Sequence, residues 1–183
     1  NLKQMRADSK KKGAKILSVV NVTGSAIGEE SENVIYTKAG REIAVATTKA
    51  LSSQLVVIYI LALFLASNKN LLTIEQSKEI IHEIFQLPEK IETALRCSEI
   101  TKELAKHIST EEHIFFIGRG IDYPLCLEGA LKLKEISYIH CEGYGAGELK
   151  HGTISLIEPG TVVVAIATDD SLYGKTISNI KEV

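Results

Sequence analysis

The sequence predicts an α/β fold of two units, each with a parallel sheet flanked by helices. Two β-branched apolar runs, at residues 16–20 and 161–167, have the pattern of strands buried on both faces. Each run ends in a small polar segment followed by helix-compatible residues, as strands of open α/β sheets do. A long helical region separates the two runs, so a duplicated α/β unit is predicted.

The first half begins with a helical pattern at residues 2–12, which Gly13 can terminate as a C-cap. The strand at 16–20 follows, and a second, brief strand is expected at 34–37 before a turn at Gly40. These elements supply the strands of the first unit.

The middle of the chain is predicted to be helical. Residues 42–66 read as one long, mostly apolar helix, and Pro88 is expected to separate two further helices at 74–86 and 89–108. The longest apolar run, at 55–66, is too short to span a bilayer and is interpreted as a buried helix.

The α/β pattern restarts with a strand at 113–117 and a tight Gly-Arg-Gly loop. Asp122 can cap the next helix, which has Pro124 near its first turn and extends to about residue 137. A glycine-rich loop is expected at 141–147, before the second β-branched strand and a final helix.

Composition narrows the function. Among 183 residues, 21 Lys and Arg face 23 Asp and Glu, a formal net charge of −2 without the basic excess that favours nucleic acid or anionic membranes. The polar, Lys-rich start does not resemble a signal peptide. Three cysteines form no disulfide framework, with Cys126 expected in the core and Cys141 in a loop. A cytoplasmic protein is therefore expected.

The helix at 122–137 carries the sharpest chemical pattern. Glu128, Lys132 and Glu135 are spaced to share one helical face. A salt-bridged solvent face is one interpretation. The other is a site, because the rest of the helix is almost all apolar and follows a loop at a strand end. There a carboxylate can move a proton beside a carbonyl while the ammonium stabilises the oxyanion.

Two loops offer weaker signals. His151 lies between glycines in the 147–152 loop and could act as a general acid or base, although a structural histidine is the simpler interpretation. A metal site of His140, Glu142, Glu148 and His151 matches no zinc spacing and is not predicted. The tip at 21–25 offers hydroxyls and amides to a polyol or phosphate, or forms an ordinary turn.

Residues 118–120, 127–140 and 146–152 resemble the isomerase part of the glutamine–fructose-6-phosphate aminotransferase family. The first half, including 20–25 and 39–43, resembles sugar isomerase (SIS) domains more broadly. The resemblance extends over essentially the whole chain. It implies an α/β fold of two SIS-type, flavodoxin-like, three-layer units, the first truncated at its N-terminus.

The resemblance also divides the chain. Residues 1–72 would be the C-terminal part of the first SIS domain, 73–108 connecting helices, and 109–183 a second SIS domain truncated at its C-terminus. The glutaminase domain, the phosphate-holding loop expected upstream of Asn1 and the imine-forming lysine expected beyond Val183 are not in the sequence. The chain alone is therefore expected to be inactive.

The implied reaction converts fructose 6-phosphate and glutamine-derived ammonia to glucosamine 6-phosphate, without cofactor or metal. Glu135 would move the proton between C1 and C2, Lys132 would assist at the oxyanion, and Glu128 would support the site. His151 would help to open the sugar ring from the neighbouring subunit, which implies a homodimer. The implied sugar contacts are Val22, Thr23 and Ser25.

Two other functions stay open. SIS domains also serve as non-catalytic, sugar-phosphate-binding regulatory modules, but such a sensor needs no Lys132–Glu135 pair. A purely structural dimerisation domain would pack the same helical face against a partner.

Overall fold

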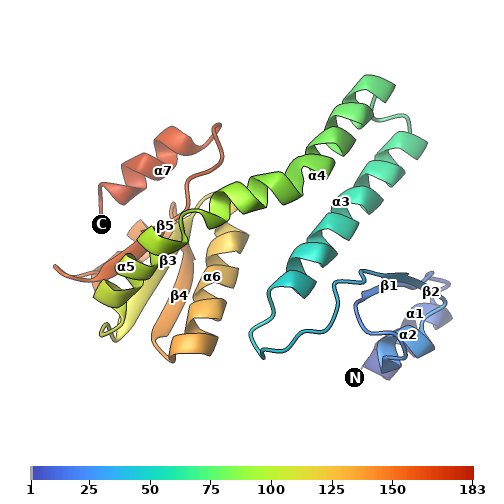
Figure 1. Ribbon diagram of the computed structural model, residues 1–183, viewed down its shortest axis with the longest axis horizontal. Helices are drawn as coiled ribbons and strands as arrows, with labels where there is room; N and C mark the ends of the chain where they lie inside the picture. Colours follow the sequence, from blue (N-terminus) through green and yellow to red (C-terminus); the bar gives the residue numbers. More distant parts are fainter. Residues whose placement is uncertain (1) are drawn as a thin grey trace. The chain divides into compact units, whose positions relative to one another are not determined.

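The computed structural model describes residues 2–183, and the chain divides into two compact units, Asn1–Ala94 and Leu95–Val183 (Figure 1). The first unit contains α1 (Leu2–Lys11), β1 (Leu17–Val20), α2 (Ala26–Glu30), β2 (Asn33–Tyr36), α3 (Lys49–Asn68) and α4 (Ile74–Leu95), whose last residue already belongs to the second unit. The second contains α5 (Ser98–Ile108), β3 (His113–Gly118), α6 (Asp122–Ser137), β4 (His140–Gly145), the 3₁₀ turns η1 (Leu149–His151) and η2 (Thr153–Leu156), β5 (Val162–Ala165) and α7 (Tyr173–Ile180).

The sheet of the first unit has two parallel strands, β1 and β2, joined by the short helix α2. Their register pairs Leu17 with Asn33 and Val20 with Tyr36. The predictions of an N-terminal helix and of strands near 16–20 and 34–37 are confirmed, with boundary shifts of one or two residues. Parallel pairing through a helical crossover is what the α/β pattern requires.

The predicted helix at 42–66 begins seven residues later, at Lys49. The Glu42 carboxylate accepts a hydrogen bond from the backbone N–H of Thr48, with Oε1 and N 2.7 Å apart. This contact closes residues 42–48 into a loop, and the sequence does not reveal it because the residues involved also favour helix.

The apolar helix α3 was interpreted as buried, and this was wrong: none of its residues is buried. Ile58, Tyr59 and Phe64 are more than half exposed. Within residues 2–183, α3 is the one helix whose length and composition would suffice to cross a membrane. It contacts β1, so one side of the helix packs on the sheet of its own unit.

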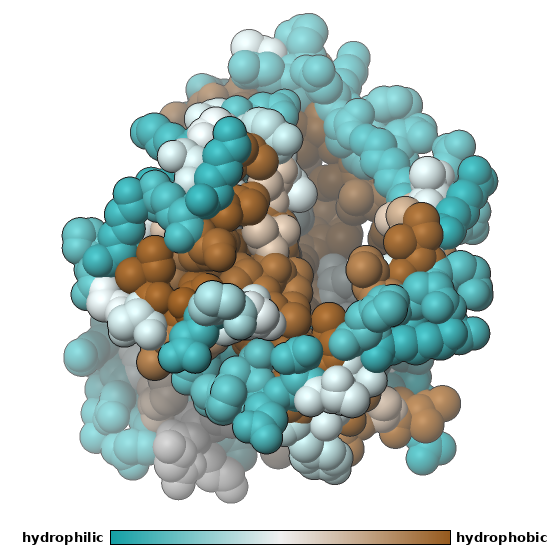
Figure 2. All heavy atoms as spheres, turned by 90° about the vertical axis from the view of Figure 1, so that its left-hand side faces the viewer, coloured by the Kyte–Doolittle hydropathy of each residue, from teal (hydrophilic) through white to brown (hydrophobic). Residues whose placement is uncertain are grey.

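Pro88 does not separate two helices, because α4 continues through it and the break falls at Arg96 and Cys97. Proline removes one backbone hydrogen bond from a helix interior, to the carbonyl four residues earlier. Most of α4 is exposed, so a water molecule can donate a hydrogen bond to the carbonyl oxygen of Ile84 in place of the missing N–H of Pro88. Exposed apolar side chains occur throughout the chain, and Figure 2 shows them as brown atoms among hydrophilic ones on one face.

The second unit has a parallel three-stranded sheet of order β4–β3–β5. The central strand β3 pairs along its length with β4, and Ile114 to Ile117 pair with Val162 to Ala165. The chain moves from β3 to one neighbour through α6 and then crosses to the other side of β3. This reversal is the topological switch point at which α/β sheets open a crevice.

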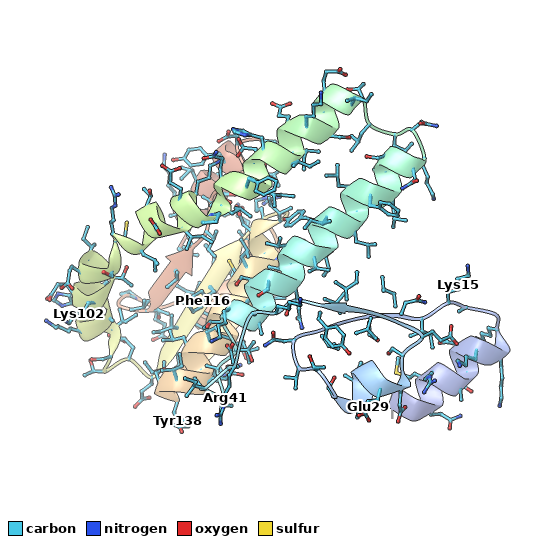
Figure 3. The ribbon with its side chains drawn as sticks, turned by 45° about the vertical axis from the view of Figure 1, so that its right-hand side comes forward. Lys15, Glu29, Arg41, Lys102, Phe116 and Tyr138 are labelled. Atoms are coloured by element: carbon cyan, nitrogen blue, oxygen red, sulfur yellow. The ribbon has the colours of Figure 1, made fainter. Side chains whose placement is uncertain are left out.

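Both faces of this sheet are covered. On one face, Phe116 and Ile114 of β3 pack with Cys126 and Ala130 of α6 (Figure 3). On the other, Ile117 packs with residues of the 146–157 segment and with Ile180 of α7. The strand is therefore buried on both sides, as the apolar run of β3 predicts.

The glycine-rich segment predicted as a loop at 141–147 instead forms β4. Gly143 faces α6, where an added Cβ would lie 3.1 Å from the Cα and N of Leu127. Glycine thus lets the helix backbone approach the strand closely. Because glycine is uncommon in strands, the composition of this segment does not predict one. Cys141, expected as a loop thiol, is fully buried in this strand, and Cys126 is buried as predicted.

The helix at 122–137 is confirmed with the predicted limits, but Asp122 does not cap it. The Asp122 side chain is buried and accepts hydrogen bonds from Thr168 N at 2.9 Å, Thr168 Oγ1 at 2.5 Å and Asp169 N at 3.3 Å. It joins the start of α6 to the loop after β5. The hydrogen bond from the Thr168 hydroxyl is the main cause that holds the pKa of Asp122 below its usual value.

Candidate functional site

The three charged residues predicted to share a face of α6 do so, with Lys132 between the two carboxylates. Lys132 Nζ lies 2.7 Å from Glu135 Oε2 and 3.5 Å from Glu128 Oε1. These side chains are 21%, 31% and 32% exposed, respectively, so they lie at the surface without being fully solvated. The i, i+3 and i, i+4 spacing produces this arrangement directly.

Lys132 stays an ammonium in this arrangement. The hydrogen bond to Glu135 is the main cause that raises the pKa of Lys132, and the negative charges of both carboxylates add to it. A raised pKa makes the lysine a poor proton carrier at neutral pH and a good hydrogen-bond donor. The group suited to move a proton is therefore a carboxylate, while the ammonium stabilises negative charge on a neighbouring oxygen.

The surroundings of these residues are apolar. Leu125, Leu131 and Ile136 flank the charged stripe on the same helix and are 46%, 43% and 67% exposed. A solvated helix face normally carries polar residues in such positions. A charged stripe between exposed leucine and isoleucine side chains fits a surface that a ligand or another protein segment covers.

Glu135 of α6 does not lie near the end of the strand that precedes the helix. The helix begins at the Gly-Arg-Gly loop, but Glu135 lies 13 residues after Asp122, which is about 20 Å along the axis. Glu135 is therefore far from the carboxyl end of β3. The apolar composition of α6 does not bury the whole helix, because only Asp122, Cys126 and Ala130 are buried.

His151, the other predicted catalytic residue, lies at the end of η1 in the same unit. It is exposed, and within the described part of the chain no hydrogen bond or ion pair involving its side chain is present. The loop that carries it is nonetheless anchored, since Leu149 is buried and the Lys150 ammonium lies 2.7 Å from Glu182.

The predicted sugar contacts belong to the first unit, at the end of β1. Val22 and Thr23 are exposed, and Ser25 is the N-cap of α2, where its hydroxyl accepts from Gly28 N at 3.3 Å. Asn21 supports this tip, because its amide oxygen accepts from Ala39 N at 2.8 Å and from Thr37 Oγ1 at 3.1 Å. The 21–25 segment is thus a polar turn that side-chain hydrogen bonds hold in place.

No metal site was predicted, and across residues 2–183 no group of three or more potential ligands gathers around a common point. His140 and Glu142 do approach each other, with Nε2 and Oε1 3.5 Å apart, and His140 Nδ1 lies 3.2 Å from His113 Nδ1. These residues line a pocket of about 710 Å³ near the amino ends of the strands. Glu148 and His151, the other two residues considered as metal ligands from the sequence, follow the opposite, carboxyl end of β4.

Two side chains in the second unit had no predicted role and are strongly held. Arg119 donates from Nη1 to Asn179 Oδ1 at 2.8 Å, and Asn179 is only 9% exposed. The only sequence signal was the position of Arg119 between two glycines at a strand end. Asn179 gave none, because a single amide in a helix is unremarkable.

Comparison with known proteins places this geometry in a family. A model of the SIS domain matches residues 2–64 and 107–181. Glutamine–fructose-6-phosphate aminotransferase (isomerizing) from Clostridium tetani is 53% identical over 176 residues, which are 96% of this chain and 29% of that protein. The protein of the same name from Clostridium acetobutylicum is 52% identical over the same shares.

A solved structure gives the same result. The C-terminal domain of glucosamine-fructose-6-phosphate aminotransferase from Francisella tularensis superposes with a TM-score of 0.92 at 41% identity, over 96% of this chain and 50% of that one. The resemblance and the SIS-type α/β fold predicted from the sequence are confirmed. The chain spans 29% of the length of the curated relatives above. With the SIS model matched in both units, the chain belongs to the SIS domain family.

Proposed function

We propose that this chain is part of the sugar-isomerising half of a glutamine-dependent aminotransferase that makes glucosamine 6-phosphate from fructose 6-phosphate. The observation that carries the proposal is Lys132, held 2.7 Å from Glu135 on an apolar, exposed helix face. The names of the relatives that match 96% of the chain support the same reaction.

In this proposal Glu135 takes a proton from C1 of the sugar and returns it to C2. Negative charge develops on the neighbouring oxygen as the C1 proton leaves, and the Lys132 ammonium donates a hydrogen bond to it. Glu128 holds Lys132 from the other side, which keeps the ammonium charged and in place. No step requires a metal or an organic cofactor.

Other parts of the proposal extend beyond the helix. Val22, Thr23 and Ser25 contact the sugar, and His151 opens the sugar ring after entering the neighbouring subunit of a homodimer. A glutaminase domain supplies the ammonia, and the protein works in the cytoplasm. The domain limits proposed are 1–72, 73–108 and 109–183.

Glu135→Gln in the gene product that contains this chain tests the proposal. Glutamine keeps the shape and hydrogen bonding of the side chain but cannot accept the C1 proton, so glucosamine 6-phosphate formation should fall by roughly 10²- to 10⁴-fold. Glutamine hydrolysis, measured in the same samples, should change little. Lys134→Gln, on another face of the same helix, is the matched control and should retain both activities.

Normal glucosamine 6-phosphate formation by the Glu135→Gln protein would overturn the proposal. Binding of fructose 6-phosphate without turnover by the unmodified protein, measured by calorimetry, would instead identify a sugar-phosphate-binding regulatory module.

A further inference from the structure

Arg119 connects three segments of the second unit at the carboxyl end of β3. Its own backbone follows Gly118, whose carbonyl accepts from Ala146 N at 2.9 Å. Its Nη1 donates to Asn179 Oδ1 of α7 at 2.8 Å. Its guanidinium also lies against Gly147, at the start of the loop that carries His151.

A side chain at Gly147 would have to displace the Arg119 guanidinium. A Cβ added to Gly147 would lie 2.7 Å from Arg119 Nη1 and 3.1 Å from its Cζ. The guanidinium can lie this close to the backbone because glycine has no side chain. Gly147 is therefore the point at which Arg119 meets the loop.

A second contact with the loop lies two steps further along the same network. Asn179 Nδ2 donates to Glu182 Oε2 at 3.3 Å, and Glu182 Oε1 lies 2.7 Å from Lys150 Nζ. The hydrogen bond from Lys150 is the main cause that lowers the pKa of Glu182, so this carboxylate is charged at neutral pH. Lys150 is the residue directly before His151.

The loop that carries His151 is buried at some residues and exposed at others. Ala146 and Leu149 are buried in the core beneath Ile117, whereas Glu148 and His151 are exposed. The loop is thus contacted at residues 146, 147, 149 and 150, directly before the exposed His151.

We propose that Arg119 is the positioning residue for His151, acting through Gly147 on one side and through Asn179, Glu182 and Lys150 on the other. The inference rests on the proposed function, in which His151 opens the sugar ring. In that step a base removes the proton of the C2 hydroxyl, the bond between C2 and the ring oxygen breaks, and the ring oxygen gains a proton. One imidazole can accept the first proton and donate the second, provided that it is held in place.

The experiment compares two substrates in the gene product that contains this chain. Fructose 6-phosphate is mostly cyclic and must be opened. Its 5-deoxy analogue lacks the hydroxyl that closes the ring, so it needs no opening. Turnover of both is measured for the unmodified protein, His151→Ala, Arg119→Ala, Arg119→Lys and the double variant.

If Arg119 positions His151, Arg119→Ala should lower kcat/KM for fructose 6-phosphate by roughly 10- to 100-fold and leave the 5-deoxy substrate nearly unchanged. Arg119→Lys should behave similarly, because an ammonium cannot both contact Gly147 and reach Asn179 as a planar guanidinium does. The double variant with His151→Ala should be no worse than His151→Ala alone.

The outcomes separate the inference from the proposed function. If His151→Ala lowers turnover of both substrates equally, or of neither, the ring-opening role proposed for His151 fails. If His151→Ala separates the substrates and Arg119→Ala lowers both equally, Arg119 is only structural and the inference is overturned. Should Arg119→Ala not fold, Lys150→Ala at the exposed end of the network must separate the substrates in the same direction, or the inference fails.

Discussion

The two units share an α/β pattern but bury very different interiors. The second closes a three-stranded sheet between two cores, and nine apolar side chains are buried in it, from Ile114 to Leu149. In the first, which has two strands, Val20 and Ala46 are the apolar side chains that reach that state among residues 4–94, whose burial the structure describes. Sheets of two strands are marginal alone, whereas a third strand with a covered face confers independent stability. The side chains of α6 that carry the proposed chemistry therefore lie in the unit that buries more apolar side chains in this chain.

The largest expected contrast between the units is in core truncation. Phe116→Ala removes a ring that packs between β3 and α6 and should lower the free energy of unfolding by about 3–5 kcal/mol. Val20→Ala removes two methyl-sized groups from the small interior of the first unit, worth about 1.5 kcal/mol. Urea unfolding followed by circular dichroism measures both.

Equal shifts in those two unfolding curves would contradict the contrast. Hydrogen exchange on the unmodified chain is the companion measurement, and amides of β3 should exchange far more slowly than those of β1.

Glycine substitutions should give a smaller difference of the same sign. In Gly143→Ala the new methyl meets backbone atoms of Leu127 at 3.1 Å, which cannot retreat without moving α6, and about 1–3 kcal/mol should be lost. In Gly28→Ala the methyl meets Ser25 Oγ at 3.2 Å and the Tyr36 hydroxyl at 3.3 Å, which are the ends of side chains. Those ends can shift, and alanine favours helix, so the net change should stay within about 1 kcal/mol.

Thermal unfolding of the two variants checks this. If Gly28→Ala proved the more damaging substitution, the first unit would be packed more tightly than its burial indicates.

These contrasts also show where sequence reasoning succeeds. The helix at 122–137 and the shared face of Glu128, Lys132 and Glu135 follow from periodicity, since both depend only on residues a few positions apart. The strand β4 was missed because its glycines lower the strand propensity of the segment, and the close approach of α6 that Gly143 allows is a tertiary contact that no local pattern records.

Side-chain partners far apart in sequence were missed for a related reason. Asp122 is a residue type that often caps helices and stands where an N-cap is expected, yet its carboxylate accepts a hydrogen bond from Thr168, 46 residues away. Arg119 and Asn179 are 60 residues apart, and no sequence pattern around either residue predicts their hydrogen bond. The motif resemblance identified the candidate residues of the site, whereas the contacts from Arg119 through Asn179 and Glu182 to Lys150 required the structure.

The smallest expected effect is on how the free energy of unfolding changes as the pH falls. The folded pKa is lowered for Asp122 in the second unit, chiefly by the Thr168 hydroxyl, and for Glu32 in the first, chiefly by its hydrogen bond with Lys10. A lowered folded pKa contributes stability that is present above the ordinary pKa and is lost as the pH falls through the folded value. Both groups therefore stabilise the chain at neutral pH and cease to do so in acid.

The two carboxylates should differ in how they respond to substitution and salt. Asp122 is buried, and Asp122→Asn keeps an acceptor for Thr168 but removes the titrating charge, so the acid limb of the stability curve should flatten. Glu32 and Lys10 are nearly half exposed, so Glu32→Gln should change that limb little, and high salt should remove what change there is. Urea midpoints measured from pH 7 down to pH 3, with and without added salt, distinguish the two. A flattening by Glu32→Gln alone would mean that the acid sensitivity resides in the first unit, on its surface, and not in the joint between α6 and the loop after β5.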